Sequence, residues 1–166
     1  SPLYPTLLAA ARLVAGQGAA IEQSIAQGVN FILFLCAFAA LEYLVREVRW
    51  TTRARLPGAP PNDTAWRILV YALFGVLTVG WIRLWMPTPD MAVAAIVLAT
   101  AGVGTRLATG RGRWPSVVVF GLLLGLGYLA KAVLLPIGIC SLVSLAALVR
   151  RRPGGLSHIA MATLIF

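Results

Sequence analysis

The stretch GVNFILFLCAFAALEYLV, residues 28–45, decides the fold class. It is close to the length of about 20 apolar residues that an α-helix needs to cross the roughly 30 Å hydrocarbon core of a bilayer. Backbone polar groups in lipid must be satisfied within the segment, and no part of the chain shows the alternation of a barrel strand. We therefore predict a transmembrane helix over about residues 26–46.

Further apolar runs follow this segment and predict a polytopic bundle. We expect transmembrane helices at about 66–85, 89–108, 115–135 and 137–150, and the start of another at 158–166. The N-terminal SPLYPTLLAAARLVAG is shorter and is interrupted by Arg12, which predicts an interfacial helix at 3–15 on the external face. A crossing helix is the alternative there. The predicted fold is all-α, in a single membrane-embedded domain covering 1–166.

The composition supports this class and argues against others. Of the 166 residues, 60% are hydrophobic and 11% are charged, whereas soluble domains are nearer half apolar and a quarter charged. The net charge of +9 does not indicate a nucleic-acid partner, because the basic residues form short groups between long apolar runs. Cys36 and Cys140 lie inside apolar runs and behave as small hydrophobic residues.

The positions of the basic groups predict the orientation. Arginines follow the first, third and fifth predicted spans, whereas Arg83 stands alone on the connection between the second and third. Under the positive-inside rule, the arginine-rich loops face the cytoplasm of a multi-pass plasma (inner) membrane protein. These arginines are Arg46, Arg49, Arg53 and Arg55, then Arg106, Arg111 and Arg113, then Arg150, Arg151 and Arg152.

The two ends of the sequence predict a piece of a longer protein. The chain begins at Ser1 rather than methionine, and HIAMATLIF (158–166) ends inside an apolar run. No basic region with a cleavage site of small residues precedes the first apolar segment. The Ala/Arg/Gly-rich usage is typical of a bacterial source.

Three segments carry a resemblance to a known family. They are SPLYPTLLAAARLVAG (1–16) with Asn30 opening the next apolar helix, TPDMAVAAIVLATAGVGTRLATGRGRW (88–114) and GLLLGLGYLAKAVLLPIG (121–138). In order, spacing and orientation they resemble the polytopic glycosyltransferases of the C superfamily, which include protein mannosyltransferase-like enzymes and aminoarabinose transferases. The resemblance covers the chain from Ser1 to about Val149.

This resemblance implies a cell-envelope enzyme that moves a sugar from a polyprenyl-phosphate carrier to a lipid or protein acceptor at the external face. The family's general base is an acidic residue in the first external loop, which would precede Ser1. No residue of this chain inherits that role, so we assign no catalytic residue and expect that the fragment does not catalyse transfer alone. The resemblance leaves dependence on a divalent metal open, and we assign no metal ligand.

Four residues near the predicted external face are candidates for substrate binding. Lys131 lies five residues before Pro136, within the reach of a snorkelling side chain, and resembles the family's lysine near the outer helix end. It either anchors the interface or neutralises the carrier phosphate. Asp90 either starts a helix with Thr88 as its cap, or accepts hydrogen bonds from sugar hydroxyls or pairs with Arg83.

The other two candidates have similar alternatives. Arg83 either snorkels beside Trp81 and Trp85 or binds a phosphate. Tyr4 either anchors the interfacial helix or contacts donor or acceptor. We expect these four side chains to meet at one water boundary, opposite the arginine groups.

The remaining polar residues predict structural roles. Glu42 and Arg46 are spaced for a helical ion pair, and Asn30 is typical of a side chain that bonds between helices. His158 has no cysteine near it in sequence, so nothing supports a zinc site, and no phosphate-binding loop or nucleophile elbow occurs. The rival hypothesis is a non-catalytic membrane subunit or a transporter component, although the spans hold few charges for a transport path.

Overall fold

The computed structural model describes residues 2–16, 21–55, 63–82, 86, 88–149 and 155–166. Every regular element in these ranges is helical, which confirms the all-α prediction for the described residues. The elements are α1 (Leu3–Ala15), α2 (Glu22–Arg55), α3 (Asp63–Val76), the π-helical turn η2 (Leu77–Trp81), α4 (Asp90–Ala108), α5 (Trp114–Ala130), α6 (Leu134–Val149) and α7 (Gly155–Ile165).

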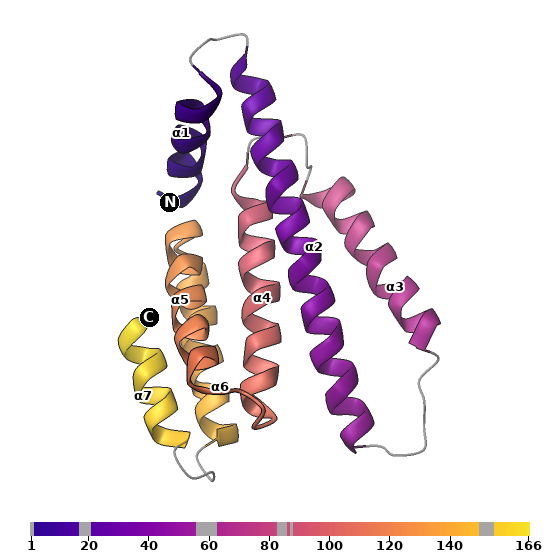
Figure 1. Cartoon of the computed structure of the whole chain (residues 1–166), viewed down its shortest axis with the longest axis vertical. Coiled ribbons are helices and arrows are strands. Elements are labelled where there is room, and N and C mark those ends of the chain that lie inside the picture. The colour runs from indigo at the N-terminus through magenta and orange to yellow at the C-terminus, as the bar shows by residue number, and fades with distance from the viewer. Residues whose placement is uncertain (1, 17–20, 56–62, 83–85, 87, 150–154) are drawn as a thin grey trace.

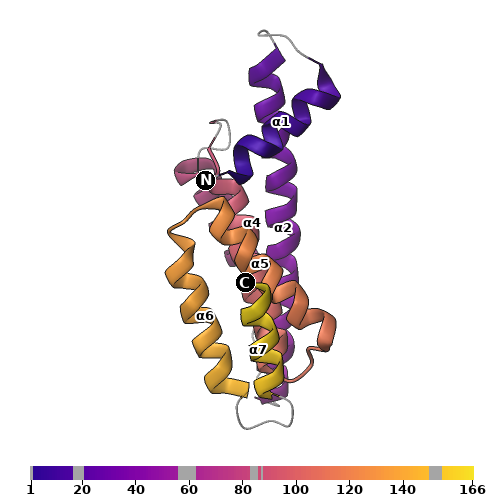
Figure 2. The same cartoon turned by 90° about the vertical axis from the view of Figure 1, so that its left-hand side faces the viewer.

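The helices form a layered bundle with α2 and α4 at its centre (Figure 1). Helix α3 lies on one side of α2, whereas α5, α6 and α7 lie beyond α4. The α5–α6 pair and α7 are separated more clearly in Figure 2, where α1 lies across the opposite end of the bundle from α7. A core of apolar side chains joins α4, α5, α6 and α7 and includes Val103, Leu107, Val117, Phe120 and Leu142.

Among the described residues, two helices are long and apolar enough to cross a membrane. These are α2 and α4; the 34 residues of α2 correspond to about 50 Å and the 19 of α4 to about 28 Å. Only 22% of the most apolar window of α2 is buried, and Phe31, Ile32 and Leu35 are at least half exposed. The other apolar helices are only 10–17 residues long, so a bundle with more than two membrane spans stays a prediction.

Helix α2 extends well beyond the predicted end at residue 46. Thr51 and Thr52 are β-branched, yet their hydroxyls donate to the carbonyl oxygens of Glu47 and Val48 at 2.8 and 3.0 Å, which keeps them compatible with the helix. The expected Glu42–Arg46 ion pair is present, with Arg46 Nε 2.9 Å from Glu42 Oε1. Glu42 also contacts Arg67 and Tyr71, so it fastens α3 to α2.

The corner between α5 and α6 differs from the predicted corner at Pro136. Helix α5 ends at Ala130 rather than 135, and Lys131 has an extended backbone with φ −161° and ψ 120°. Pro136 lies inside the first turn of α6, where a missing N–H breaks no helical hydrogen bond. The proline therefore belongs to the first turn of the next helix and does not form the corner.

The start of α4 also corrects the predicted capping. Pro89 occupies the N-cap position, and no side-chain hydrogen bond caps the helix, so Thr88 does not have the predicted role. The predicted segment 66–85 becomes α3 followed by the π-helical turn η2, and residues 83–85 lie outside the described part of the chain.

Candidate functional site

An ion pair joins two of the residues singled out from the sequence. Lys131 Nζ lies 3.0 Å from Asp90 Oδ1, although the two residues are 41 positions apart. The side chains are 49% and 42% exposed, so the pair adds little to stability and stays accessible to a ligand. An exposed cation held by one carboxylate is able to accept an additional anionic partner.

Asp90 and Lys131 each lie at the end of a helix, where the helix dipole favours their charge. Asp90 is the first residue of α4, where the positive end of the helix dipole favours a carboxylate. Lys131 directly follows α5, where the last carbonyl groups favour a cation. Because α5 ends earlier than predicted, Lys131 stands at the corner itself and does not have to snorkel toward it.

A buried hydrogen-bond chain lies near this pair and ties three segments together. The Tyr4 hydroxyl donates to Asn30 Oδ1 at 2.9 Å, and Asn30 Nδ2 donates to the Met86 carbonyl oxygen at 2.6 Å. Tyr4 and Asn30 are 5% and 2% exposed. Burial raises the pKa of Tyr4, an effect partly opposed by the hydrogen bond with Asn30, so the hydroxyl remains a donor at neutral pH. The predicted interhelical role of Asn30 is confirmed.

The structure brings three of the four candidates to one region of the bundle. Met86, at the end of the Tyr4–Asn30 chain, precedes Asp90 by four residues, and Asp90 bonds Lys131. Arg83 lies outside the described residues, so its predicted pairing with Asp90 stays a prediction. Tyr4 is buried against Asn30, which makes it an anchor for α1 in this structure rather than an open contact for a ligand.

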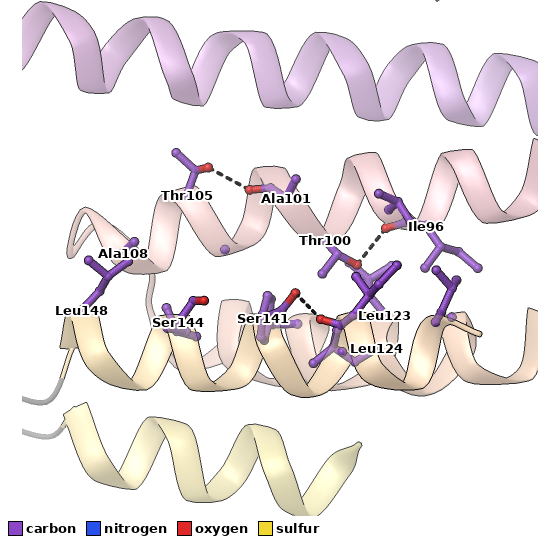
Figure 3. Close-up of a pocket in the computed structure, with 18 residues that line it drawn as sticks. Ile96, Thr100, Ala101, Thr105, Ala108, Leu123, Leu124, Ser141, Ser144 and Leu148 are labelled. Atoms are coloured by element: carbon purple, nitrogen blue, oxygen red, sulfur yellow. Dashed lines mark hydrogen bonds between the residues drawn. The ribbon is translucent and has the colours of Figure 1, made fainter. Parts of the chain in front are cut away.

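A mainly apolar groove of about 300 Å³ runs between α4, α5 and α6 (Figure 3). Lys131 stands at one end of it, because its backbone N–H bonds the Gly127 carbonyl and its own carbonyl accepts from Leu134 N–H. Both Gly127 and Leu134 line the groove. At the other end the lining includes Ala108 and Leu148.

The hydroxyls in the groove keep its lining compatible with an apolar ligand. Thr100, Thr105 and Ser141 donate to helix carbonyl oxygens at 2.7, 2.8 and 2.8 Å, as the dashed lines of Figure 3 show for bonds among the drawn residues. The hydroxyl hydrogens of these three residues are therefore satisfied within their own helices. Ser144 adds a fourth hydroxyl to the lining. The remaining surface is supplied mostly by aliphatic side chains and glycines.

Sequence reasoning missed this groove. Its width depends on small residues on facing helices, among them Gly104, Gly127 and Gly138, and each of these alone is ordinary in an apolar helix. A shared face of small residues and hydroxyls on α4 and α6 was the available signal. Within the described ranges, no group of three His, Cys, Asp or Glu residues could hold a metal ion.

Replacing Tyr4 with phenylalanine tests the buried chain. We expect Tyr4→Phe to lower the free energy of unfolding by about 1–2 kcal/mol, because Asn30 loses the donor to its buried oxygen. Thermal unfolding of the full-length protein in detergent measures this. Tyr128→Phe is the matched control, since Tyr128 is 48% exposed. Equal melting temperatures for the two variants would contradict the assignment.

No protein-family model, curated protein or solved structure matches this chain.

Proposed function

We propose that this chain is part of a polytopic membrane glycosyltransferase, which moves a sugar from a polyprenyl-phosphate carrier to a lipid or protein acceptor at the external face. The observation that carries the proposal is the half-exposed Asp90–Lys131 pair at one end of an apolar groove. A polyprenyl phosphate has the complementary form, with an anionic head on a long hydrocarbon chain.

The groove and the lysine recognise different parts of this donor. Aliphatic side chains of α4, α5 and α6 would bury several isoprene units, which the hydrophobic effect favours in proportion to the area removed from water. Lys131, at the α5–α6 corner, would then face the phosphate. The groove volume suits part of the chain, and the rest would lie in lipid.

In the transfer step, the bond between the sugar C1 and the phosphate oxygen breaks and its electron pair stays on the phosphate. The acceptor hydroxyl forms the new bond and gives its proton to a carboxylate, which the family resemblance places before Ser1. Lys131 would stabilise the negative charge on the leaving phosphate. Asp90 would hold the ammonium group in position and accept a hydrogen bond from a sugar hydroxyl.

The proposed membrane placement uses the exposed apolar surface of the helices. Helices α2 and α4 have the length of a span, and we propose that α3, α5 and α6 cross as well, with the arginine-rich turns in the cytoplasm. Large exposed side chains such as Ile68, Leu73 and Val143 would then contact lipid. Asp90 and Lys131 would lie at the external boundary, with α1 along it.

Filling the groove tests donor binding. We expect Ser141→Phe to weaken the binding of undecaprenyl phosphate to the full-length protein in nanodiscs at least about tenfold, because the ring would occupy the space of the hydrocarbon chain. Cys140→Phe is the matched control, since Cys140 is the exposed neighbour on α6 and does not line the groove.

The result of this experiment decides between two classes of protein. Binding that is lost in Ser141→Phe and kept in Cys140→Phe supports the donor site, and sugar transfer by the wild-type protein in liposomes completes the case. Equal binding by both variants would remove the groove from the site. A full-length protein that neither binds undecaprenyl phosphate nor transfers sugar would contradict the proposed function and favour the rival hypothesis of a non-catalytic membrane subunit or a transporter component.

A further inference from the structure

At the end of the bundle opposite Asp90 and Lys131, the C-terminal end of α2, the last turn of α4 and the turn leading into α5 lie close together (Figure 1), and each of these segments carries arginines. We name this region the basic patch, and it comprises Arg49, Trp50, Arg53, Arg106, Arg111, Arg113 and Trp114. The C-terminal part of α2, the last turn of α4 and the turn leading into α5 contribute these residues. They lie together because α2 packs along α4.

One buried carboxylate organises the patch. Glu47 is 5% exposed, and its Oε2 atom lies 2.7 Å from Arg111 while its Oε1 atom lies 3.8 Å from Arg106. The guanidinium of Arg111 also stacks over the Trp50 ring at 3.9 Å. These contacts hold Arg106 and Arg111 against α2 and so fix the turn before α5.

The patch retains more positive than negative charge. It holds five arginines, and two of them, Arg106 and Arg111, share the carboxylate of Glu47. Arg53 and Arg113 are exposed to solvent. Trp50 and Trp114 are 46% and 47% exposed beside these arginines. Exposed tryptophans next to cations are typical of a membrane–water interface, where the indole ring sits at headgroup level.

We propose that the basic patch binds the headgroup of an anionic phospholipid of the cytoplasmic leaflet. Guanidinium groups bind phosphate oxygens through paired hydrogen bonds, and the tryptophans would pack against the glycerol and upper acyl region. The inference depends on the proposed membrane placement but uses neither the groove nor the Asp90–Lys131 pair. The binding of lipid here would fasten the cytoplasmic ends of α2, α4 and α5 to the membrane surface.

Titration with defined lipids tests the inference. The melting temperature of the full-length protein in nonionic detergent is followed against added phosphatidylglycerol, with phosphatidylcholine and inorganic phosphate as separate arms. We expect stabilisation by phosphatidylglycerol alone. In Arg53→Gln/Arg113→Gln the apparent affinity should fall on the order of tenfold or more, since each exposed cation near an anionic surface contributes to binding.

Arg12→Gln is the matched control, because Arg12 is an exposed arginine on α1 at the other end of the bundle. It should keep the wild-type lipid response. Equal stabilisation by phosphatidylcholine or by inorganic phosphate would overturn the inference, as would an unchanged affinity in the double variant. If the double variant fails to fold, the wild-type protein is titrated with phosphatidylglycerol at high salt instead. We expect the stabilisation to be lost there, because salt screens exposed charges. Stabilisation that does not depend on salt would overturn the inference. A protein that transfers sugar but shows no preference for phosphatidylglycerol would contradict the lipid-binding inference alone and leave the proposed function intact.

Discussion

Replacing Lys131 with alanine is expected to lower the rate of sugar transfer by the full-length protein on the order of a hundredfold. The ammonium group of Lys131 lies at the end of the groove near Asp90, and its Nζ atom is 3.0 Å from Asp90 Oδ1. Its removal would leave Asp90 facing the carrier phosphate, so a stabilising charge would be replaced by a repelling one. Transfer from a polyprenyl-phosphate donor in liposomes measures the effect.

Two further variants make this prediction specific. Lys131→Arg keeps the charge and should retain much more activity than Lys131→Ala. Arg46→Ala removes an exposed cation paired with Glu42, away from the groove, and should leave transfer unchanged. A wild-type rate in Lys131→Ala would remove the lysine from the donor site.

The largest effect on stability is expected at Glu47. Replacing it with alanine leaves Arg106 and Arg111 without their shared carboxylate, and the Arg106 Nε atom is already buried without a hydrogen-bond partner. Breaking a fully buried ion pair costs about 3–5 kcal/mol, but these arginines are 39% and 33% exposed and solvent screens part of the charge. We therefore expect a loss of about 2–3 kcal/mol in the free energy of unfolding.

Thermal unfolding in detergent compares Glu47→Ala with a control at an exposed carboxylate. Glu22→Ala removes the partner of Arg12, a pair in which both side chains are at least half exposed, so its effect should stay below about 1 kcal/mol. Equal destabilisation by the two substitutions would show that burial of Glu47 does not determine the energetics of the α2–α4 contact.

Features that depend on near neighbours in the chain were predictable from the sequence. Glu42 and Arg46 are four residues apart, and helix geometry alone brings them together. The apolar runs predicted an all-helical chain because their length exceeds any ordinary strand. The ends of the helices were harder to predict, since Thr51 and Thr52 continue α2 through hydroxyl bonds to the preceding turn.

Contacts between distant segments could not be predicted in the same way. Asp90 and Lys131 were each noted as candidates, but their ion pair depends on how α4 and α5 align, which no local pattern specifies. Glu47 and its partner Arg111 lie 64 positions apart, so no local pattern predicts their ion pair either. Pro136 illustrates a different difficulty, because a proline suits both a turn and the first turn of a helix.

Asn30 sets the register of three segments at once, since a single amide accepts from α1 and donates to the backbone before α4. Inserting one residue before Tyr4 would leave the tyrosine in the same position relative to the rest of α1. Inserting one residue within α1 after Tyr4 would rotate the tyrosine relative to the rest of that helix by about 100°. The hydroxyl and the rest of α1 could then no longer both keep their places. The hydrogen bond between Tyr4 and Asn30 therefore fixes the position of α1 along α2. A variant that moves α1 would need a new residue pair in place of this tyrosine and this asparagine.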